Sequence, residues 1–326
     1  NICLSLNKSS YTKHTYEFVH GPSNLKPLYW GIFDPDKFPN AKCFDIHAEH
    51  GSSILERKTA WPSPTFLDSV ENYGGSAIQT GRYYYNHTWR LYNCPVEQGP
   101  CIIDSEVLKY FLKKGVMQQE HIKYKFIPRY TIPHEPFKLL YTTLQKLGVN
   151  KKFIKHMINT FVGSLGRRKY KKYTGFVSNT EESLCYVPEE RNYLPRRISD
   201  ELLVCYNKKT VEIEANHRCI YQAIVDDEYR HMDIMLRELT DDKSVVLGMK
   251  TDAVIILNPK KRELYKDPEP GQIRAEKLPA AFAQAHSLTA TFILKNTAFK
   301  PTAHCDNRPI DYDEQTFVNS SEKFAD

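Results

Sequence analysis

The segment Lys155-His-Met-Ile-Asn159-Thr-Phe-Val-Gly163, followed by Ser164-Leu-Gly166-Arg167-Arg168-Lys169, decides how the rest of the chain is interpreted. It predicts a helix that places Lys155 and Asn159 one turn apart on a single face, because residues four positions apart lie above one another. We expect the helix to stop at Gly163 and Gly166, ahead of the cations. The apolar side of this helix is expected to consist of Phe153, Met157, Ile158, Phe161 and Val162.

Two interpretations fit this segment. A cation and an amide on an exposed face, beside a glycine-rich basic exit, suit a polyphosphate or a nucleic-acid backbone, and Arg167, Arg168 and Lys169 are then candidate DNA contacts. Alternatively, this is an ordinary amphipathic helix that ends in glycine, with basic residues that the helix dipole favours near its C-terminus. The position of the segment between two acidic segments favours the first interpretation.

Composition bounds the class of protein. A chain of 326 residues has room for one large multi-lobed domain or two to three smaller ones. The formal net charge of +6 permits a nucleic-acid partner without requiring one. The eight cysteines form no C-x-x-C pair, so neither a zinc ribbon nor a disulfide framework is expected. Without a run of about 18 apolar residues or a signal peptide, we expect a soluble intracellular protein with no membrane partner.

The first acidic segment lies upstream of the helix. Residues 41–46 predict a short strand that carries Asp45 at its end, followed by a turn and a helix. A carboxylate at such a place projects into a cleft and suits Mg²⁺, which takes hard oxygen ligands. The alternative is that Asp45 caps the following helix. The order His47-x-Glu49-His50 lacks the i, i+4 spacing of a helical zinc motif, so zinc is not expected from it.

The second acidic segment lies downstream. Residues 220–239 predict a long helix, and 244–257 predict two buried strands joined by a tight turn with Asp252 near its tip. A charged side chain between two such strands costs several kcal/mol if it is desolvated without a partner. Asp252 is therefore either a solvated tip residue or a partner of Asp45 across a cation.

The remaining pattern predicts helices and strands in alternation. Helices over 137–147 and from Asn150 onward should pack antiparallel as a helical hairpin that projects from a sheet-based body. Asp104 is a candidate N-cap for a helix over 105–114. Two further strands, 202–206 and 210–213, are expected to pair around residues 207–209.

Three segments together resemble the palm and fingers motifs of family B DNA polymerases. Phe44-Asp45-Ile-His-Ala-Glu-His50-Gly-Ser52 is similar to D-x-x-S-L-Y-P-S, the segment 155–163 to K-x-x-x-N-S-x-Y-G, and Met249-Lys250-Thr-Asp252-Ala253 to Y-x-D-T-D-S. The resemblance covers residues 30–275 or so. It is greater to the divergent branch found in viruses, linear plasmids and self-synthesising transposons than to cellular replicative enzymes.

The resemblance implies an activity, a cofactor and site residues. It implies DNA-directed DNA polymerase activity on primer–template DNA and dNTPs, with two Mg²⁺ ions, or Mn²⁺ in their place, on Asp45 and Asp252. Lys155 would contact the triphosphate, Asn159 and Gly163 would line the pocket under the nascent base pair, and His50 stands at the position that excludes ribose. Partners would include a terminal protein or another priming factor.

The sequence departs from the family pattern at Lys250, which stands where an aspartate is usual and should weaken metal binding. No paired acidic exonuclease motif precedes Asp45, so proofreading is not expected. The chain begins at Asn rather than Met, which suggests a fragment. Lys260, Lys261 and Arg262 are either contacts to primer-strand phosphates or a solvated charge run.

The expected fold is α+β: a polymerase palm, with an antiparallel sheet and packed helices, interrupted by a helical-hairpin fingers insertion and followed by a partial thumb. The expected regions are an N-terminal segment (1–30), a first part of the palm (31–130), the fingers (131–168), a second part of the palm (169–276) and a partial thumb or C-terminal tail (277–326). Two alternatives stay open. One is a catalytically impaired, polymerase-like relic that binds nucleic acid, and the other is an unrelated α+β protein.

Overall fold

The computed structural model describes residues 36–65, 67–166, 217–260 and 268–278 in full, with single positions at 15, 18, 19, 25, 28 and 264. For seven further strands the backbone is described, namely 29–33, 169–178, 194–199, 202–212, 282–284, 292–294 and 297–299. The described strands within 169–212 form one compact unit, and the other described parts of the chain belong to a larger unit. The architecture is mixed α+β with antiparallel sheets, as the sequence predicts.

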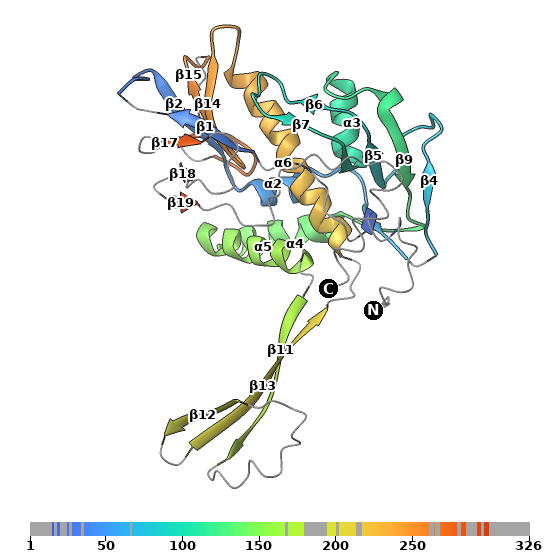
Figure 1. Cartoon of the computed structure of the whole chain (residues 1–326), viewed down its shortest axis with the longest axis vertical. Coiled ribbons are helices and arrows are strands. Elements are labelled where there is room, and N and C mark those ends of the chain that lie inside the picture. Colours follow the sequence, from blue (N-terminus) through green and yellow to red (C-terminus); the bar gives the residue numbers. More distant parts are fainter. Residues whose placement is uncertain are drawn as a thin grey trace. The chain divides into compact units, whose positions relative to one another are not determined.

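A six-stranded antiparallel sheet carries both acidic segments (Figure 1). Its strands follow the order β16-β2-β15-β14-β1-β17. Val254 and Ile256 of β15 belong to one buried cluster and Ile255 to another, so this strand is covered on both faces and reads as a continuous apolar run. The bounds are β1 (Tyr29–Phe33), β2 (Ala41–Ile46), β14 (Val245–Lys250), β15 (Ala253–Leu257), β16 (Ile273–Glu276) and β17 (Phe282–Gln284).

The long helix α6 (Arg218–Leu239) packs against β2 of this sheet and also against β8 (Cys101–Asp104). Its apolar residues Met232, Met235 and Leu236 are fully buried in the cluster that also holds Phe44 of β2. The same helix packs on α2 (Glu49–Glu56), α3 (Ser105–Lys113) and α5 (Lys151–Leu165). Acidic and basic side chains of α6 are thereby brought against the helix that follows β2.

A four-stranded sheet in the order β4-β9-β5-β8 forms the other side of this core. Tyr83, Tyr84 and Tyr85 of β5 are buried, so the tyrosine-rich run is interior. Asp104 caps α3 as predicted, because its side chain accepts a hydrogen bond from the amide of Glu106 at 2.9 Å. Other elements of the larger unit are β3 (Trp61–Ser63), β4 (Val70–Asn72), β5 (Arg82–Tyr85), β6 (Trp89–Arg90), β7 (Glu97–Gln98), β8 (Cys101–Asp104), the 3₁₀ helix η2 (Gln119–His121), β9 (Ile122–Phe126), β10 (Tyr130–Ile132), β18 (Phe292–Leu294) and β19 (Thr297–Phe299).

The predicted helical hairpin is present, with α4 (Glu135–Lys146) joined to α5 through Gly148. Asn150 caps α5 by accepting from the amide of Lys152 at 2.8 Å, which explains why the helix begins there. Two details of the prediction are wrong. Ile158 and Val162 are buried as predicted, but Ile154 is buried as well and Phe153 is 55% exposed. The helix also continues through Gly163 and ends at Leu165, with Gly166 as its C-cap.

The smaller unit is a three-stranded antiparallel sheet of β11 (Lys169–Ser178), β13 (Leu202–Glu212) and β12 (Leu194–Ser199), with β13 in the middle. The predicted hairpin around 207–209 is wrong, since β13 runs straight through these residues. Each of them pairs with a residue of β11, which supplies the backbone partners that a turn would otherwise provide. The expected second part of the palm, 169–276, therefore divides between the two units.

Two of the expected regions lie mostly outside the described residues, namely the N-terminal segment and the partial thumb. None of the described helices combines the length and the apolar character that crossing a bilayer requires.

Candidate functional site

The two aspartates that the sequence predicts to form a pair lie at one end of neighbouring strands, Asp45 within β2 and Asp252 in the turn before β15. Asp45 of β2 is the register partner of Ala253, the residue after Asp252. The amide of Ile46 donates to the carbonyl oxygen of Asp252 at 3.0 Å. Asp252 lies in the two-residue turn between β14 and β15, with Thr251 at a positive φ of 48°. The sheet thus brings both acidic segments together at one end of adjacent strands.

The Asp45 carboxylate is buried, with 1% of its side chain exposed, and Arg274 neutralises it. Arg274 of β16 is the register partner of Asp45, and its Nη2 and Nε atoms donate to Asp45 Oδ2 at 2.7 and 3.0 Å. Asp45 does not cap α2, because the N-cap position is Ala48. Asp252 is half-buried, and its Oδ1 accepts from the hydroxyl of Thr251 at 2.9 Å.

This donor set partly fits a divalent cation. Two carboxylates at the end of adjacent strands supply the hard oxygen ligands that Mg²⁺ prefers. Arg274 competes for one oxygen of Asp45, and Lys250, the last residue of β14, adds a second positive charge to the same hairpin. A metal held by Asp45 and Asp252 would have to share the Asp45 carboxylate with Arg274.

A cavity of about 590 Å³ lies between the start of α2, the α4–α5 hairpin and the segment 268–274. This is a usual size for a small-molecule site. Lys155 and Asn159 both line it from the exposed face of α5, one turn apart as predicted. Arg274 lines the same cavity, so the guanidinium that holds Asp45 also borders this space. The lining cations are Lys151, Lys152, Lys155 and Arg274, and the lining carboxylate is Glu269.

His47 also lines the cavity, and its pKa is lowered by burial and in part by the positive charges around the cavity. Burial, followed by the charges of Arg274 and Lys155, lowers the pKa of His47 below its ordinary value. The imidazole is therefore neutral at neutral pH. An anionic ligand in this cavity would meet three lysines, beside Arg274, whose charge Asp45 already offsets.

His50 connects α2 to α5. Its Nδ1 lies 3.2 Å from Asn159 Oδ1, and its Nε2 lies 3.5 Å from Glu228 Oε1 on α6. Burial alone would lower the pKa of His50, but the hydrogen bond that it donates to Glu228 and the charge of Glu49 raise it to about 9. Two predicted site residues, His50 and Asn159, are thus in direct contact.

Next to His50, charged side chains of α2 and α6 form an ionic network of Glu49, Glu56, Asp227, Arg230 and His231. His231 contacts Glu49 through Nδ1 at 3.2 Å and both Ser52 and Glu56 through Nε2 at 3.2 Å. Arg230 donates to Glu56 at 2.9 Å and also pairs with Asp227. Burial would lower the pKa of His231, but the charge of Asp227 and its other carboxylate partners raise it to about 10, whereas burial raises that of Glu49 to about 7.

Other predicted site residues do not reach the cavity or lie outside the described residues. Gly163 is exposed and does not line the cavity. Lys260 donates from Nζ to the carbonyl oxygen of Arg237 at 3.4 Å, which places it at the C-terminus of α6. Lys169 is described by its backbone in β11 alone. The other four, Arg167, Arg168, Lys261 and Arg262, lie outside the described residues.

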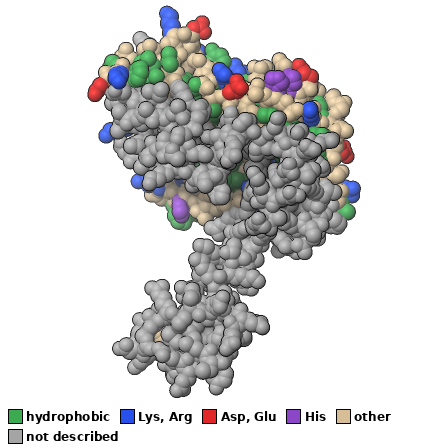
Figure 2. Space-filling view, viewed as in Figure 1, with side chains coloured by type: hydrophobic (Ala, Val, Ile, Leu, Met, Phe, Trp, Pro, Cys, Tyr) green, Lys and Arg blue, Asp and Glu red, His purple; other side chains and the backbone are tan. Residues whose placement is uncertain are grey.

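Several residues of this region were not predicted from the sequence. Lys151 precedes Lys155 by one helical turn, so the i, i+4 spacing that identified Lys155 and Asn159 would also have found it. Arg274 and Glu228 carry no such signal, since their positions depend on which strand and which helix pack against β2 and α2. On the face shown in Figure 2, the described Lys and Arg side chains are interspersed with Asp and Glu rather than gathered in one basic patch.

No protein-family model matches the sequence, and neither does any curated protein. Among solved structures, the chain is similar to an orthorhombic crystal form of Phi29 DNA polymerase, with a TM-score of 0.44 and 11% identity over 85% of this chain and 49% of that one. It is also similar to Phi29 DNA polymerase complexed with primer–template DNA, with a TM-score of 0.41 and 10% identity over 82% and 47% of the two chains. The chain spans about half the length of these structures.

Proposed function

We propose that the chain is the catalytic core of a DNA-templated DNA polymerase of family B type, which adds deoxynucleotides to a primer 3′-hydroxyl. One arrangement supports this proposal above all. Asp45 of β2 lies beside the turn before β15 that carries Asp252, and Arg274 connects Asp45 to a cavity that Lys155 and Asn159 line from a helical hairpin. These elements follow one another along the chain in the order of the three motifs quoted above.

The charges of the cavity suit the triphosphate of a nucleotide. Lys151 and Lys155 lie one turn apart on α5 and present two ammonium groups to one side of the cavity. Asn159, held by His50, would border the base or the sugar. In the reaction, the primer 3′-oxygen bonds to the α-phosphorus and pyrophosphate leaves, so that one nucleotide is added. Mg²⁺ on Asp45 and Asp252 would supply Lewis-acid stabilisation of the developing charge.

A second function is favoured by a specific observation. Arg274 on Asp45, together with Lys250 on the neighbouring hairpin, supplies protein cations where the polymerase motifs call for metal ions. A polymerase-like module that binds nucleic acid without turnover accounts for these cations. Such a module would bind DNA equally well with and without Mg²⁺.

Primer extension distinguishes the two functions. We expect the chain to extend a labelled primer–template in the presence of Mg²⁺ and dNTPs. Asp252→Asn should slow extension by at least about a hundredfold, because it removes a metal-binding charge. Asp242→Asn, which alters an exposed aspartate in the turn before β14, is the matched control and should retain full activity.

Each failure has a distinct meaning. Mg²⁺-independent DNA binding without extension favours the non-catalytic module. Extension that Asp252→Asn leaves unchanged contradicts the assigned site.

A further inference from the structure

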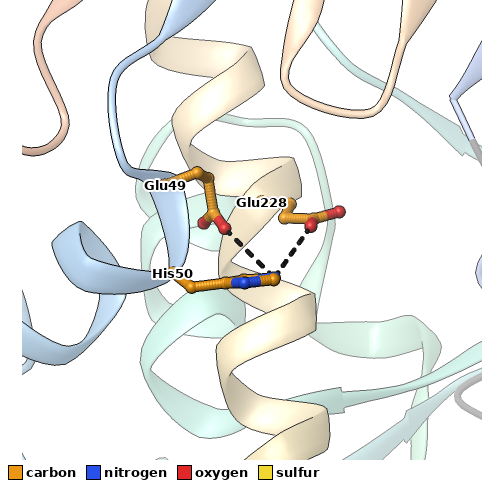
Figure 3. A group of neighbouring side chains, drawn as sticks. All are labelled: Glu49, His50 and Glu228. Atoms are coloured by element: carbon orange, nitrogen blue, oxygen red, sulfur yellow. Dashed lines mark ion pairs between the residues drawn. The ribbon is translucent and has the colours of Figure 1, made fainter. Parts of the chain in front are cut away.

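Three side chains of metal-binding type converge between α2 and α6 (Figure 3). Glu49 and His50 are the first two residues of α2, and Glu228 lies on α6. Each offers one ligand atom, and these atoms all lie within 4.8 Å of one another. Figure 3 shows both carboxylates directed at the same edge of the imidazole, with Nε2 at 3.5 Å from Glu228 Oε1 and 3.8 Å from Glu49 Oε2.

One oxygen of the Glu49 carboxylate faces the place where the three side chains converge and lacks a hydrogen-bond partner among the described residues. Its side chain is 4% exposed, and within the described part of the chain its Oε2 atom is buried without a hydrogen-bond partner. Its Oε1 atom is held by the hydroxyl of Ser53 at 2.7 Å and by His231 Nδ1 at 3.2 Å. A buried carboxylate oxygen without a partner is costly. The carboxylate is therefore fixed in place with one oxygen in need of a ligand.

The imidazole of His50 is oriented as metal-binding histidines are. Its Nδ1 lies against Asn159 Oδ1, which can only accept a hydrogen bond. Nδ1 therefore donates, and Nε2 is the atom that faces the two carboxylates. Histidine ligands of metal ions donate their second ring nitrogen to an acceptor in this way, which fixes both the tautomer and the ring plane.

The surrounding charges favour a cation. The carboxylates of Glu49, Glu56, Asp227 and Glu228 meet the cations Arg230 and His231 in this network. These four carboxylates outnumber the cations Arg230 and His231, and a proton on His50 supplies further positive charge at the convergence point. A divalent ion would replace that proton, since a metal-bound imidazole is neutral, and would be the missing partner of Glu49 Oε2.

We propose that Glu49, His50 and Glu228 bind one divalent first-row transition-metal ion of the Zn²⁺ class. An imidazole with two carboxylates is a donor set that suits Zn²⁺, whereas Mg²⁺ prefers oxygen ligands throughout. Three protein ligands leave a fourth position for water. The ion would cross-link α2 to α6 and, through the bond between His50 and Asn159, fix the face of α5 that lines the cavity. The proposal does not depend on polymerase activity.

Binding of Zn²⁺ alone to the metal-stripped full chain, without DNA or nucleotide, tests this site. Isothermal titration should show one equivalent of tight binding that survives an excess of Mg²⁺. Glu228→Gln should weaken it by more than about 100-fold, and Asn159→Ala, which removes the acceptor of Nδ1, by about 10- to 100-fold. Co²⁺ in place of Zn²⁺ should give visible absorption bands that Glu228→Gln abolishes.

Surface histidines provide the control. His87 and His121 have ring centroids 4.1 Å apart and could hold zinc adventitiously. His87→Gln should leave the binding unchanged. Loss of binding in His87→Gln with retention in Glu228→Gln, or no saturable binding at all, overturns the proposal. Glu228 is 19% exposed, and matched circular dichroism spectra establish that its variant is folded. If that variant fails to fold, His50→Gln takes its place with the same expectations.

Discussion

Arg274 is the main counter-charge of the buried Asp45 carboxylate. Its guanidinium donates twice to the buried Asp45 carboxylate and also pairs with Glu276 at 2.6 Å. Removing it leaves a buried carboxylate with its main counter-charge missing. We expect Arg274→Gln to lower the free energy of unfolding by about 1–3 kcal/mol, measured by urea denaturation. The matched variant Arg129→Gln, at a guanidinium that is 62% exposed, should change it by less than about 1 kcal/mol. Equal losses for both would contradict the assigned role of Arg274.

Substitution of Lys155 tests whether the cavity binds the incoming nucleotide. Lys155 lines the cavity from the exposed face of α5, and under the proposed function its ammonium group contacts the phosphates of a nucleotide rather than the DNA duplex. Lys155→Ala should raise the KM for dNTP by about 10-fold or more, with a smaller loss of primer–template affinity. Steady-state extension and a DNA-binding titration measure the two quantities. Lys146→Ala, on the exposed end of α4, is the control. An equal loss of both affinities in Lys155→Ala would indicate a generic phosphate contact.

At the scale of elements, two glycines of α5 should respond in opposite directions to alanine. A Cβ atom on Gly166 would lie 2.7 Å from Cδ2 of Tyr221 on α6, so Gly166→Ala must push the two helices apart. We expect a loss of about 1–3 kcal/mol. Gly163 has nothing within 4 Å of its added Cβ, and Gly163→Ala should stabilise the helix interior by about 1 kcal/mol. Thermal unfolding of both variants measures this. A loss in both would mean that α5 does not pack on α6 in this way.

The elements also show what sequence can and cannot provide. Four features could be predicted from local sequence patterns, because each depends on residues within a turn or two. They are the Asn150 cap, the Asp104 cap, the helix α6 and the hairpin that carries Asp252. The motif order then predicted that Asp45 and Asp252 meet. The partner of Asp45 could not be predicted, since Arg274 reaches it through a strand pairing across 229 positions. Glu228 likewise meets His50 through helix packing, and the strand β13 was missed because its polar middle is paired rather than turned.

At the scale of the whole molecule, the two ends of the smaller unit's described strands lie side by side. Lys169, which begins β11, pairs with Glu212, which ends β13, so these two residues are about 5 Å apart, as in any antiparallel pair. Replacing 169–212 by a short Gly-Ser linker should therefore leave the larger unit folded, with its cooperative thermal transition retained. A control with the same linker inserted after Asn207, in the middle of β13, should leave that transition unchanged too. Loss of the transition on deletion would show that the larger unit depends on the smaller one.

Asp45 and Asp252 both belong to the larger unit, and the central proposal is that they act together in templated nucleotide addition. Single-nucleotide incorporation opposite a defined template base tests it most directly, with each of the four dNTPs supplied separately in Mg²⁺. We predict that the complementary nucleotide alone is added efficiently, and that both Asp45→Asn and Asp252→Asn lose at least about a hundredfold in rate while Asp242→Asn does not. Addition that ignores the template base, or that survives both substitutions, would contradict the account.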